Sequence, residues 1–533
     1  MTNVRPRRRR ALAVGLLAVA TLAAACSGGS KSAKTPAVVT PKTGGTLRIA
    51  VERPSSLDPA QAKLPGELLL AQQLFMPLTT YEPATMAVRP GLAEKWTVTP
   101  DQMHWVFTLR AGATFANGRA VTADDVKFTF ERIASKGSTS PVAVQLELVH
   151  GYQAWSKGTA PQLEGMIVLS PSIVRIDLDQ PQSSWAAVVG NAAFGIVPKE
   201  AVAAASPKFS EQPVGSGAFR LTTRTPDTLH LVPAPGAKHY VDAVDVTLAN
   251  NEAAAYQAFR DKRVDWAPVP ADKLTDTVAK ARRVTKPYVA ELFYGFNLKD
   301  PKFADVRFRE AIVRAIDRDA IVKAVYGGTA HSVVGVVAEG IPGHLDDPCG
   351  DRCRHDVAKA KDLVARAFAG KTVPTIQIDY DDDATQGAIA KAMQANLKDA
   401  GIPAGLRPHP YADYLTFAIS GKEELFRLGW IGAYPTPDAF LYPLFVSGLA
   451  DNVTGFSSAP VDQLLKAARV DPDEAKRLSE QQAAERQIMQ QLPVVPIAQF
   501  QTDSVETLRV RDLVLSAFGT FDASSVWLAG PPA

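Results

Sequence analysis

The chain has 533 residues, of which 46% are hydrophobic and 21% charged, a composition that is typical of a globular protein and excludes a disordered one. The formal net charge of +3 falls to −2 when the five arginines of the first 25 residues are set aside, so the body lacks the basic field that attracts nucleic acid. Because the length exceeds what one core usually supports, two or three lobes are expected.

The first 25 residues have the layout of a bacterial secretion signal. Five arginines between positions 5 and 10 precede an uncharged run over residues 11–25, which suits a signal peptide but is short for a membrane span of about 20 residues. Small residues then lead to Cys26. This ending resembles a bacterial lipobox, in which the cysteine thiol is acylated. The alternative is a plain secretory signal followed by a chance cysteine.

Residues 26–43 are rich in Ser, Lys, Pro and Thr, which is typical of a flexible tether. No later stretch is apolar enough to span a bilayer. The sequence therefore predicts a body that is exported and held by Cys26 at the extracytoplasmic face of the cell membrane.

The first half of the body alternates strand and helix patterns. Apolar residues alternate over 47–51, 105–109 and 173–178, which predicts three strands. Thr122 and Asp125 have the spacing of a capping box and predict a helix that begins there.

The second half continues the alternation. Asp305 is expected to cap one long helix that carries its apolar face as far as Val325 and ends at Gly327. A strand around Ile376 is followed by a helix that ends at Gly401. Strands and helices mix throughout, so the fold class is α/β or mixed α+β.

Five blocks of sequence, spread in order over residues 44–533, resemble the family 5 extracellular solute-binding proteins, the peptide receptors of ABC importers. The blocks are GGTLR at 44–48 with LDP at 57–59; PGLAEKW at 90–96 with WVFTLR at 105–110, FANG at 115–118 and TADDV at 122–126; PVGSGAF at 213–219; FN at 296–297 with DVRFREA at 305–311 and AIDR at 315–318; and GW at 429–430 with PD at 437–438.

The resemblance implies a two-lobed periplasmic-binding-protein-like fold of type II with an extra domain inserted in lobe one. Carried onto this chain, it predicts lobe one at 44–75, 205–288 and 490–533, the inserted domain at 76–204 and lobe two at 289–489. It also implies a monomer without cofactor or metal that captures a peptide or peptide-like solute and delivers it to ABC permease subunits.

Peptide receptors of this kind bind the ligand backbone as an added strand between the lobes. In dipeptide receptors an Asp shortly after the Gly-Trp pair binds the peptide ammonium, and the matching position here is Ala433. The arginine that binds the peptide carboxylate matches a position near Tyr380, beside Asp381, where no arginine stands. The two differences favour a longer or capped peptide, or another solute, over a free dipeptide.

Trp430 and Tyr434 are predicted to form a stacking wall of the cleft, because each ring has an apolar face and a polar tip. Gly432, Ala433, Tyr380 and Asp381 are the other predicted ligand-binding residues. The alternative for Trp430 is a place in the core. The acidic run at 379–383 either caps a helix or faces the cleft and selects a cationic group.

Cys349 and Cys353 lie in a loop rich in Pro and Asp. Outside the cytoplasmic membrane thiols are oxidised, so a disulfide is expected. His344 and His355 flank the two cysteines, which leaves a Cys2His2 zinc site as the alternative.

Catalytic signatures are missing. Gly215-Ser216-Gly217 lacks the spacing of a nucleophile elbow. Residues 365–372 resemble a phosphate loop, but a helix precedes them and a strand follows, which is the reverse of the order that a phosphate loop needs. A binding protein is therefore predicted rather than an enzyme. A family member that acts in cell-envelope regulation or scaffolding, without transport, stays as the second possibility.

Overall fold

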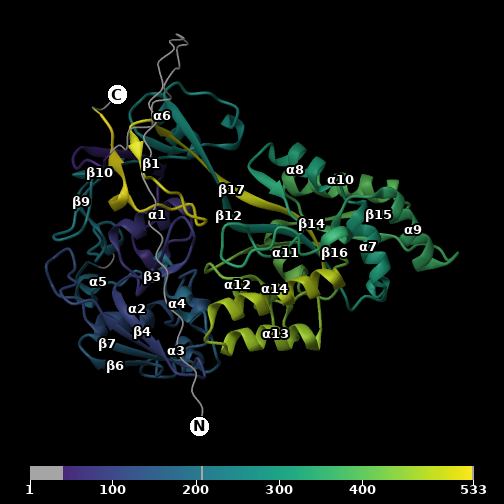
Figure 1. Ribbon diagram of the computed structural model, residues 1–533, viewed down its shortest axis with the longest axis horizontal. Helices are drawn as coiled ribbons and strands as arrows, with labels where there is room; N and C mark the ends of the chain where they lie inside the picture. Colours follow the sequence, from purple (N-terminus) through teal and green to yellow (C-terminus); the bar gives the residue numbers. More distant parts are fainter. Residues whose placement is uncertain (1–39, 206–207, 531–533) are drawn as a thin grey trace, which may run out of the picture. The chain divides into compact units, whose positions relative to one another are not determined.

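The largest sheet of the computed structural model is mixed and has eleven strands (Figure 1). Its order is β15-β14-β16-β12-β17-β11-β1-β10-β9-β8, and β13 pairs with β17 outside this path. The strands are β1 (Thr46–Glu52), β8 (Phe219–Arg224), β9 (Thr228–Pro233), β10 (Ala243–Ala249), β11 (Trp266–Pro268), β12 (Ala281–Phe296), β13 (Ala330–Ser332), β14 (Ile376–Asp381), β15 (Ala404–His409), β16 (Leu425–Ile431) and β17 (Val494–Thr507).

The structure describes residues 40–205 and 208–530. The predicted signal peptide, most of the predicted tether and Cys26 lie outside this range. In the described part, the strands predicted near 47–51, 105–109, 173–178 and 376 are all present, and the mixed α/β class is confirmed.

Two long antiparallel strands, β12 and β17, lie side by side within the large sheet and join its two halves. The first half of β12 pairs with β17 only, whereas its second half lies between β17 and β16. β17 in turn pairs with β11, which pairs with β1. The pairing of β12 with β17 shifts register between Pro287 and Glu291, which marks an irregularity near the middle of both strands.

A separate four-stranded sheet lies in the segment predicted as the inserted domain. Its order is β4-β5-β7-β6, with β4 (Ala93–Val98), β5 (His104–Leu109), β6 (Met166–Ser170) and β7 (Ile173–Asp177). Two smaller ladders pair β2 (Thr79–Tyr81) with β3 (Val88–Pro90) and β18 (Val510–Arg511) with β19 (Trp527–Leu528).

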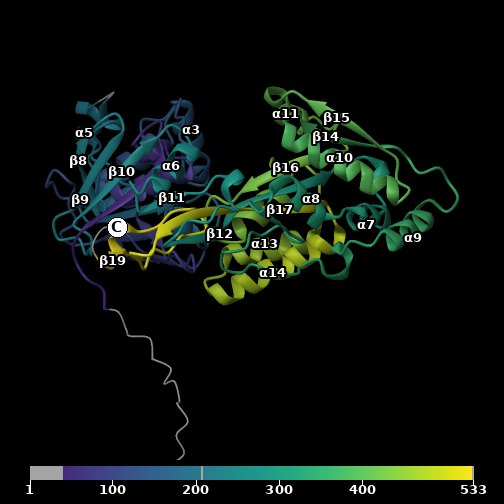
Figure 2. The same cartoon turned by 90° about the horizontal axis from the view of Figure 1, so that it is seen from above.

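Helices α12, α13 and α14 pack on one another (Figure 1), and Figure 2 shows α13 beside α14. The helices are α1 (Pro65–Leu74), α2 (Ala123–Ile133), α3 (Tyr152–Lys157), α4 (Trp185–Val188), α5 (Lys199–Ala205), α6 (Glu252–Arg260), α7 (Val306–Ala315), α8 (Arg318–Tyr326), α9 (Val357–Phe368), α10 (Ala384–Asp399), α11 (Tyr411–Phe417), α12 (Asp438–Phe445), α13 (Ala459–Val470) and α14 (Glu474–Gln491).

The capping box predicted at Thr122 is confirmed. The Asp125 carboxylate accepts hydrogen bonds from the Thr122 backbone N–H at 2.9 Å and from its hydroxyl at 3.0 Å. α2 begins at the next residue and buries Val126, Phe130 and Ile133 on one face. The local signal was sufficient here because both partners lie within one helical turn.

The single long helix predicted from Asp305 to Val325 is wrong, because the chain forms two helices. Ile316 is extended between α7 and α8, with φ −77° and ψ 116°. The Asp317 side chain then caps α8 by accepting from the Ala320 N–H. The break lets the buried Arg318 donate to the Pro496 carbonyl at 2.7 Å and the Cys353 carbonyl at 2.7 Å. These tertiary hydrogen bonds outweigh the apolar periodicity that runs through the break.

The loop before α9 contains a disulfide. The Sγ atoms of Cys349 and Cys353 are 1.97 Å apart. The two flanking histidines each contact a backbone carbonyl instead of the sulfur atoms: His344 contacts Val337 and His355 contacts Arg314. Among the residues that the structure describes, no group of three or more His, Cys, Asp or Glu side chains is arranged to hold a metal ion.

Candidate functional site

Gly432 and Ala433 lie where β16 meets the long strand β12. The Gly432 N–H donates to the Val289 carbonyl at 2.8 Å, and the Val289 N–H donates to the Ala517 carbonyl at 3.1 Å. A side chain at position 432 would meet the Phe440 ring at 2.5 Å, so glycine is required there. Through these two hydrogen bonds Val289 links Gly432 with Ala517, and the three residues are distant in sequence.

Trp430 stands on β16 with a half-buried ring. It is in register with Glu291 of β12. Its indole N–H donates to the Ala439 carbonyl at 2.7 Å, so the polar tip is already satisfied. The part of the ring that stays exposed can offer an apolar face to a ligand.

Tyr434 does not have the exposed ring that a stacking wall requires. The residue is only 6% exposed. Its hydroxyl donates to Asp438 Oδ2 at 2.7 Å and accepts from Gln182 Nε2 at 3.3 Å. Burial raises the pKa of the Tyr434 phenol well above its usual value. In this structure Tyr434 thus joins the α12 region to the segment around Gln182, which sequence reasoning could not anticipate.

The acidic run 379–383 divides into side chains with separate partners. Asp379 is fully buried and forms an ion pair with Arg407. Asp382 accepts the Tyr411 N–H at 3.1 Å, and Asp383 caps α10. Three of these acids therefore have structural partners.

Asp381 differs from its neighbours because its ion pair is loose. Asp381 Oδ2 and Arg427 Nε lie 3.7 Å apart, beyond hydrogen-bond distance, and neither atom has a hydrogen-bond partner in the described part of the chain. Arg427 is in register with Tyr294 of β12, whose buried hydroxyl is also unpaired there. Tyr380 is buried one residue before Asp381 on β14. Unpaired buried polar atoms are uncommon and often mark functional positions.

Arg427 is the cation that sequence reasoning missed. It comes three residues before Trp430, just ahead of the block at 429–438 that carries part of the family resemblance. Parallel pairing of β14 with β16 brings it to Asp381, because Ile378 is in register with Leu425. In the sequence, the arginine of dipeptide receptors matches a position near Tyr380 on β14. That match could not point to Arg427, because Arg427 lies on the neighbouring strand β16.

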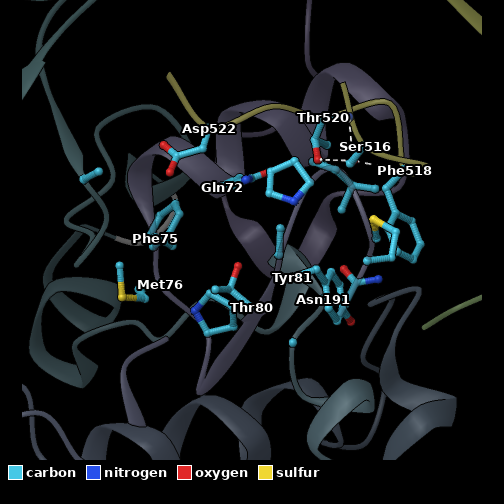
Figure 3. A pocket seen from close by; sticks show the side chains of 17 residues that line it. Gln72, Phe75, Met76, Thr80, Tyr81, Asn191, Ser516, Phe518, Thr520 and Asp522 are labelled. Carbon is cyan, nitrogen blue, oxygen red and sulfur yellow. Dashed lines mark hydrogen bonds between the residues drawn. The ribbon is translucent and has the colours of Figure 1, made fainter. Parts of the chain in front are cut away.

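A small pocket is lined by Met76, Tyr81, Asn191 and Phe518, among other residues (Figure 3). Asn191 lines this pocket, and its Nδ2 donates to the Ala433 carbonyl at 3.0 Å. The Tyr81 ring, stacked on Phe518 with centroids 5.7 Å apart, forms one wall, and Met76 is another lining residue. The volume of about 120 Å³ can take one side chain but is well below the 300–1,000 Å³ of a site for a whole ligand. We call it the Asn191 pocket.

A larger cavity of about 440 Å³ lies among the end of β1, the start of α1 and the middle of β12 and β17. Its walls include the aromatic side chains of Trp266, Tyr288 and Phe500. We call it the hinge cavity, because Tyr288 and Phe500 belong to the two long strands. Its volume lies within the range of ligand sites.

The family model for family 5 of the bacterial extracellular solute-binding proteins matches residues 87–452. This chain belongs to that family. Membership confirms the resemblance seen in the sequence, and with it the prediction of a solute-binding protein outside the cytoplasm rather than an enzyme. Across residues 40–205 and 208–530, none of the helices has the length and apolar character of a membrane span.

Two relatives and one solved structure give the scale of similarity. The dipeptide-binding protein DppE of Bacillus subtilis is 27% identical over 451 residues, which cover 81% of this chain and 82% of DppE. The periplasmic murein peptide-binding protein MppA of Escherichia coli is 27% identical over 475 residues, covering 85% and 87%. A structure of MppA in its unliganded open form superposes with a TM-score of 0.82 at 24% identity, covering 91% of this chain and 97% of that one. This last likeness confirms the predicted fold of the family.

Proposed function

We propose that this family member captures peptides or peptide-like solutes between two lobes and delivers them to the permease of an ABC transporter. Family membership carries the proposal, and the names of DppE and MppA, which record binding of a dipeptide and of murein peptides, supply the ligand class. The hinge cavity supports it, because its volume suits a small ligand and its walls come from both long strands.

The boundaries expected from the sequence are part of the proposal: lobe one at 44–75, 205–288 and 490–533, the inserted domain at 76–204 and lobe two at 289–489. Two features support them. The predicted crossing at 288–289 falls inside β12, and residue 490 lies just before β17. One buried apolar cluster also joins β1 and α1 to β8–β10 and to the C-terminal segment, as a lobe-one core requires.

We propose that Trp430, Gly432 and Ala433 contact the ligand at one end of the cleft, with Tyr380 and Asp381 near its lobe-two wall. The Trp430 ring would provide a stacking surface. Arg427 would bind a carboxylate, because its Nε has no hydrogen-bond partner within the described residues. Ala433 cannot pair with an ammonium, so free dipeptides are expected to bind more weakly than longer or N-capped peptides.

The location proposed for the protein is the extracytoplasmic face of the cell membrane, with a lipid on Cys26 as the anchor. Support comes from the sequence before residue 40, where a signal-like segment, a cysteine and a flexible stretch follow one another. A tether of this kind would leave the folded body free to meet a permease at the membrane surface.

The decisive experiment is mass spectrometry of the ligand that denaturation releases from the purified mature protein. Peptide masses that reappear after incubation of the emptied protein with the same extract would support the proposal. A non-peptide solute would overturn the ligand class. If no peptide or other solute raises the melting temperature, the non-transport role becomes the better account, because a ligand at a hundredfold over its Kd stabilises by about 2.7 kcal/mol.

A further inference from the structure

Carboxylates make up most of the charged lining of the hinge cavity. Four acidic side chains reach it, from Glu52, Glu67, Glu252 and Asp503, against one basic side chain, Arg53. A cavity with aromatic walls and an excess of negative charge favours a cation over an anion or a neutral group.

Two of the charged lining residues, Arg53 and Glu67, already have partners within the protein. Arg53 Nη2 donates to the Asp227 carboxylate at 2.8 Å, so the single base is paired. The Glu67 carboxylate accepts the backbone N–H of Ser55, which follows β1, and that of Lys63, which precedes α1, at 3.1 Å each. Within the described residues Glu52 and Glu252 form no ion pair, so their charges stay available to a ligand.

Asp503 has one oxygen without a partner. Its Oδ1 forms an ion pair with Arg283, accepting from Nη2 at 2.6 Å and from Nε at 3.0 Å, and also accepts from the Thr285 hydroxyl. Its Oδ2 has no hydrogen-bond partner in the described part of the chain, although the residue is only 5% exposed and lines the cavity. An unpaired buried carboxylate oxygen is costly, and a bound donor would remove that penalty.

The charges of Glu52 and Asp503 also act on Glu252. Burial raises the pKa of Glu252, and the negative charges of Glu52 and Asp503 raise it further. Glu252 therefore lies near both other carboxylates, and all three residues line the hinge cavity. A cation placed among them relieves the repulsion, which adds to the attraction of each single charge.

We propose that the hinge cavity binds a cationic side chain of the ligand, the ammonium of lysine or the guanidinium of arginine. This inference rests on the proposed function and specifies its ligand class. An N–H donor would pair with Asp503 Oδ2, and the alkyl chain would lie against Trp266, Tyr288 and Phe500. In this proposal the hinge cavity binds the positive charge of the ligand, and position 433, which is an alanine, does not.

The test uses tetrapeptide libraries in which one position is lysine, arginine or the uncharged isostere norleucine, prepared with free and with acetylated N-termini. The full mature protein is incubated with each library, and retained peptides are identified by mass spectrometry. Lysine and arginine peptides are expected to be retained at least tenfold over the norleucine peptides. In the double variant Glu52→Gln/Glu252→Gln, the ratio of retained lysine or arginine peptides to retained norleucine peptides should fall close to one.

Glu94→Gln is the matched control, because Glu94 is an exposed glutamate on β4 outside the cavity. It should keep the full preference. If lysine, arginine and norleucine peptides are retained equally, the cation inference is overturned while peptide binding stands. A preference that survives the double variant would also overturn it. Retention of no peptide from either library would overturn the proposed function, and this inference with it.

Discussion

Asp438 and Arg469 form a buried ion pair with two parallel hydrogen bonds, Nε to Oδ1 at 2.9 Å and Nη2 to Oδ2 at 3.0 Å. Burial alone would raise the pKa of Asp438, but Arg469 holds it below its usual value. Gln182 Nε2 donates to the same carboxylate at 3.0 Å. The pair therefore connects α12 and α13 with the segment predicted as the inserted domain.

Asp438→Ala is expected to lower the free energy of unfolding by about 3–5 kcal/mol, because Arg469 would stay buried without its partner. Urea denaturation followed by circular dichroism measures this loss. The control is Asp362→Ala, which removes an exposed ion pair with Arg366 and should change stability by less than about 1 kcal/mol. Equal effects of the two substitutions would contradict the prediction.

Glu485 should make the protein less stable as the pH rises toward neutral. Burial raises the pKa of Glu485 to about 7, although the Val336 and Val337 N–H groups oppose the shift. The folded state then binds more protons than the unfolded state between the usual glutamate pKa and 7, so the free energy of unfolding falls across this window. The fall amounts to about 3 kcal/mol at most and ends above pH 7.

Glu485→Gln is expected to remove this fall, since the amide keeps an acceptor for both N–H groups but does not ionise. Denaturation curves from pH 4.5 to 8 on the protein and the variant would show it. Glu211→Gln, at an exposed position, is the control. If the free energy of unfolding depends on pH in the same way in the protein and in Glu485→Gln, the prediction is wrong.

Trp430→Ala should weaken ligand binding at least tenfold without unfolding the protein, because truncation of a buried aromatic contact often costs 2 kcal/mol or more. Calorimetry with a peptide recovered from the protein measures the affinity. Trp430→Phe keeps a ring but loses the hydrogen bond to Ala439 and should bind more tightly than the alanine variant. A Trp430→Ala variant that fails to fold would instead favour the core interpretation.

Opening the Cys349–Cys353 disulfide should destabilise the protein by about 2 kcal/mol, because the bond closes a short loop in the unfolded chain. The double variant Cys349→Ser/Cys353→Ser tests this by thermal unfolding. Intact mass of the unmodified protein should also be two hydrogens below that of its reduced form. A stoichiometric zinc signal in the purified protein would point to the metal site instead.

Cys26→Ala should leave the precursor unprocessed or release the body into the medium, because the thiol that would carry the lipid is gone. Cell fractionation and intact mass follow both products. A variant that stays in the membrane fraction with its signal removed would contradict lipidation.

Local sequence signals predicted those features whose partners lie within a few residues. The capping box at Thr122 begins α2, and Gly327 ends α8 in the left-handed conformation. Alternating apolar residues marked β1, β5 and β7, because a strand with one buried face has a period of two. The family resemblance then added the fold, since its five blocks keep their order along the chain.

Strand register and long-range packing decided the rest. Arg427 meets Asp381 only because β14 and β16 are parallel neighbours. Tyr434 is buried, and its hydroxyl pairs with Asp438 and with Gln182, about 250 positions away in the sequence.

The sequence by itself determined the fold family and those strands, caps and helix ends whose partners lie within a few residues, but not the break between α7 and α8. Only the tertiary structure decided which charges meet. Glu52, Glu252 and Asp503 come from β1, the first turn of α6 and β17. They share the hinge cavity because β1 and β17 lie on either side of β11 in the sheet and α6 packs on β1 and β11. Electrostatic interactions depend on distance in space rather than in sequence, so no pattern along the chain could reveal that cluster.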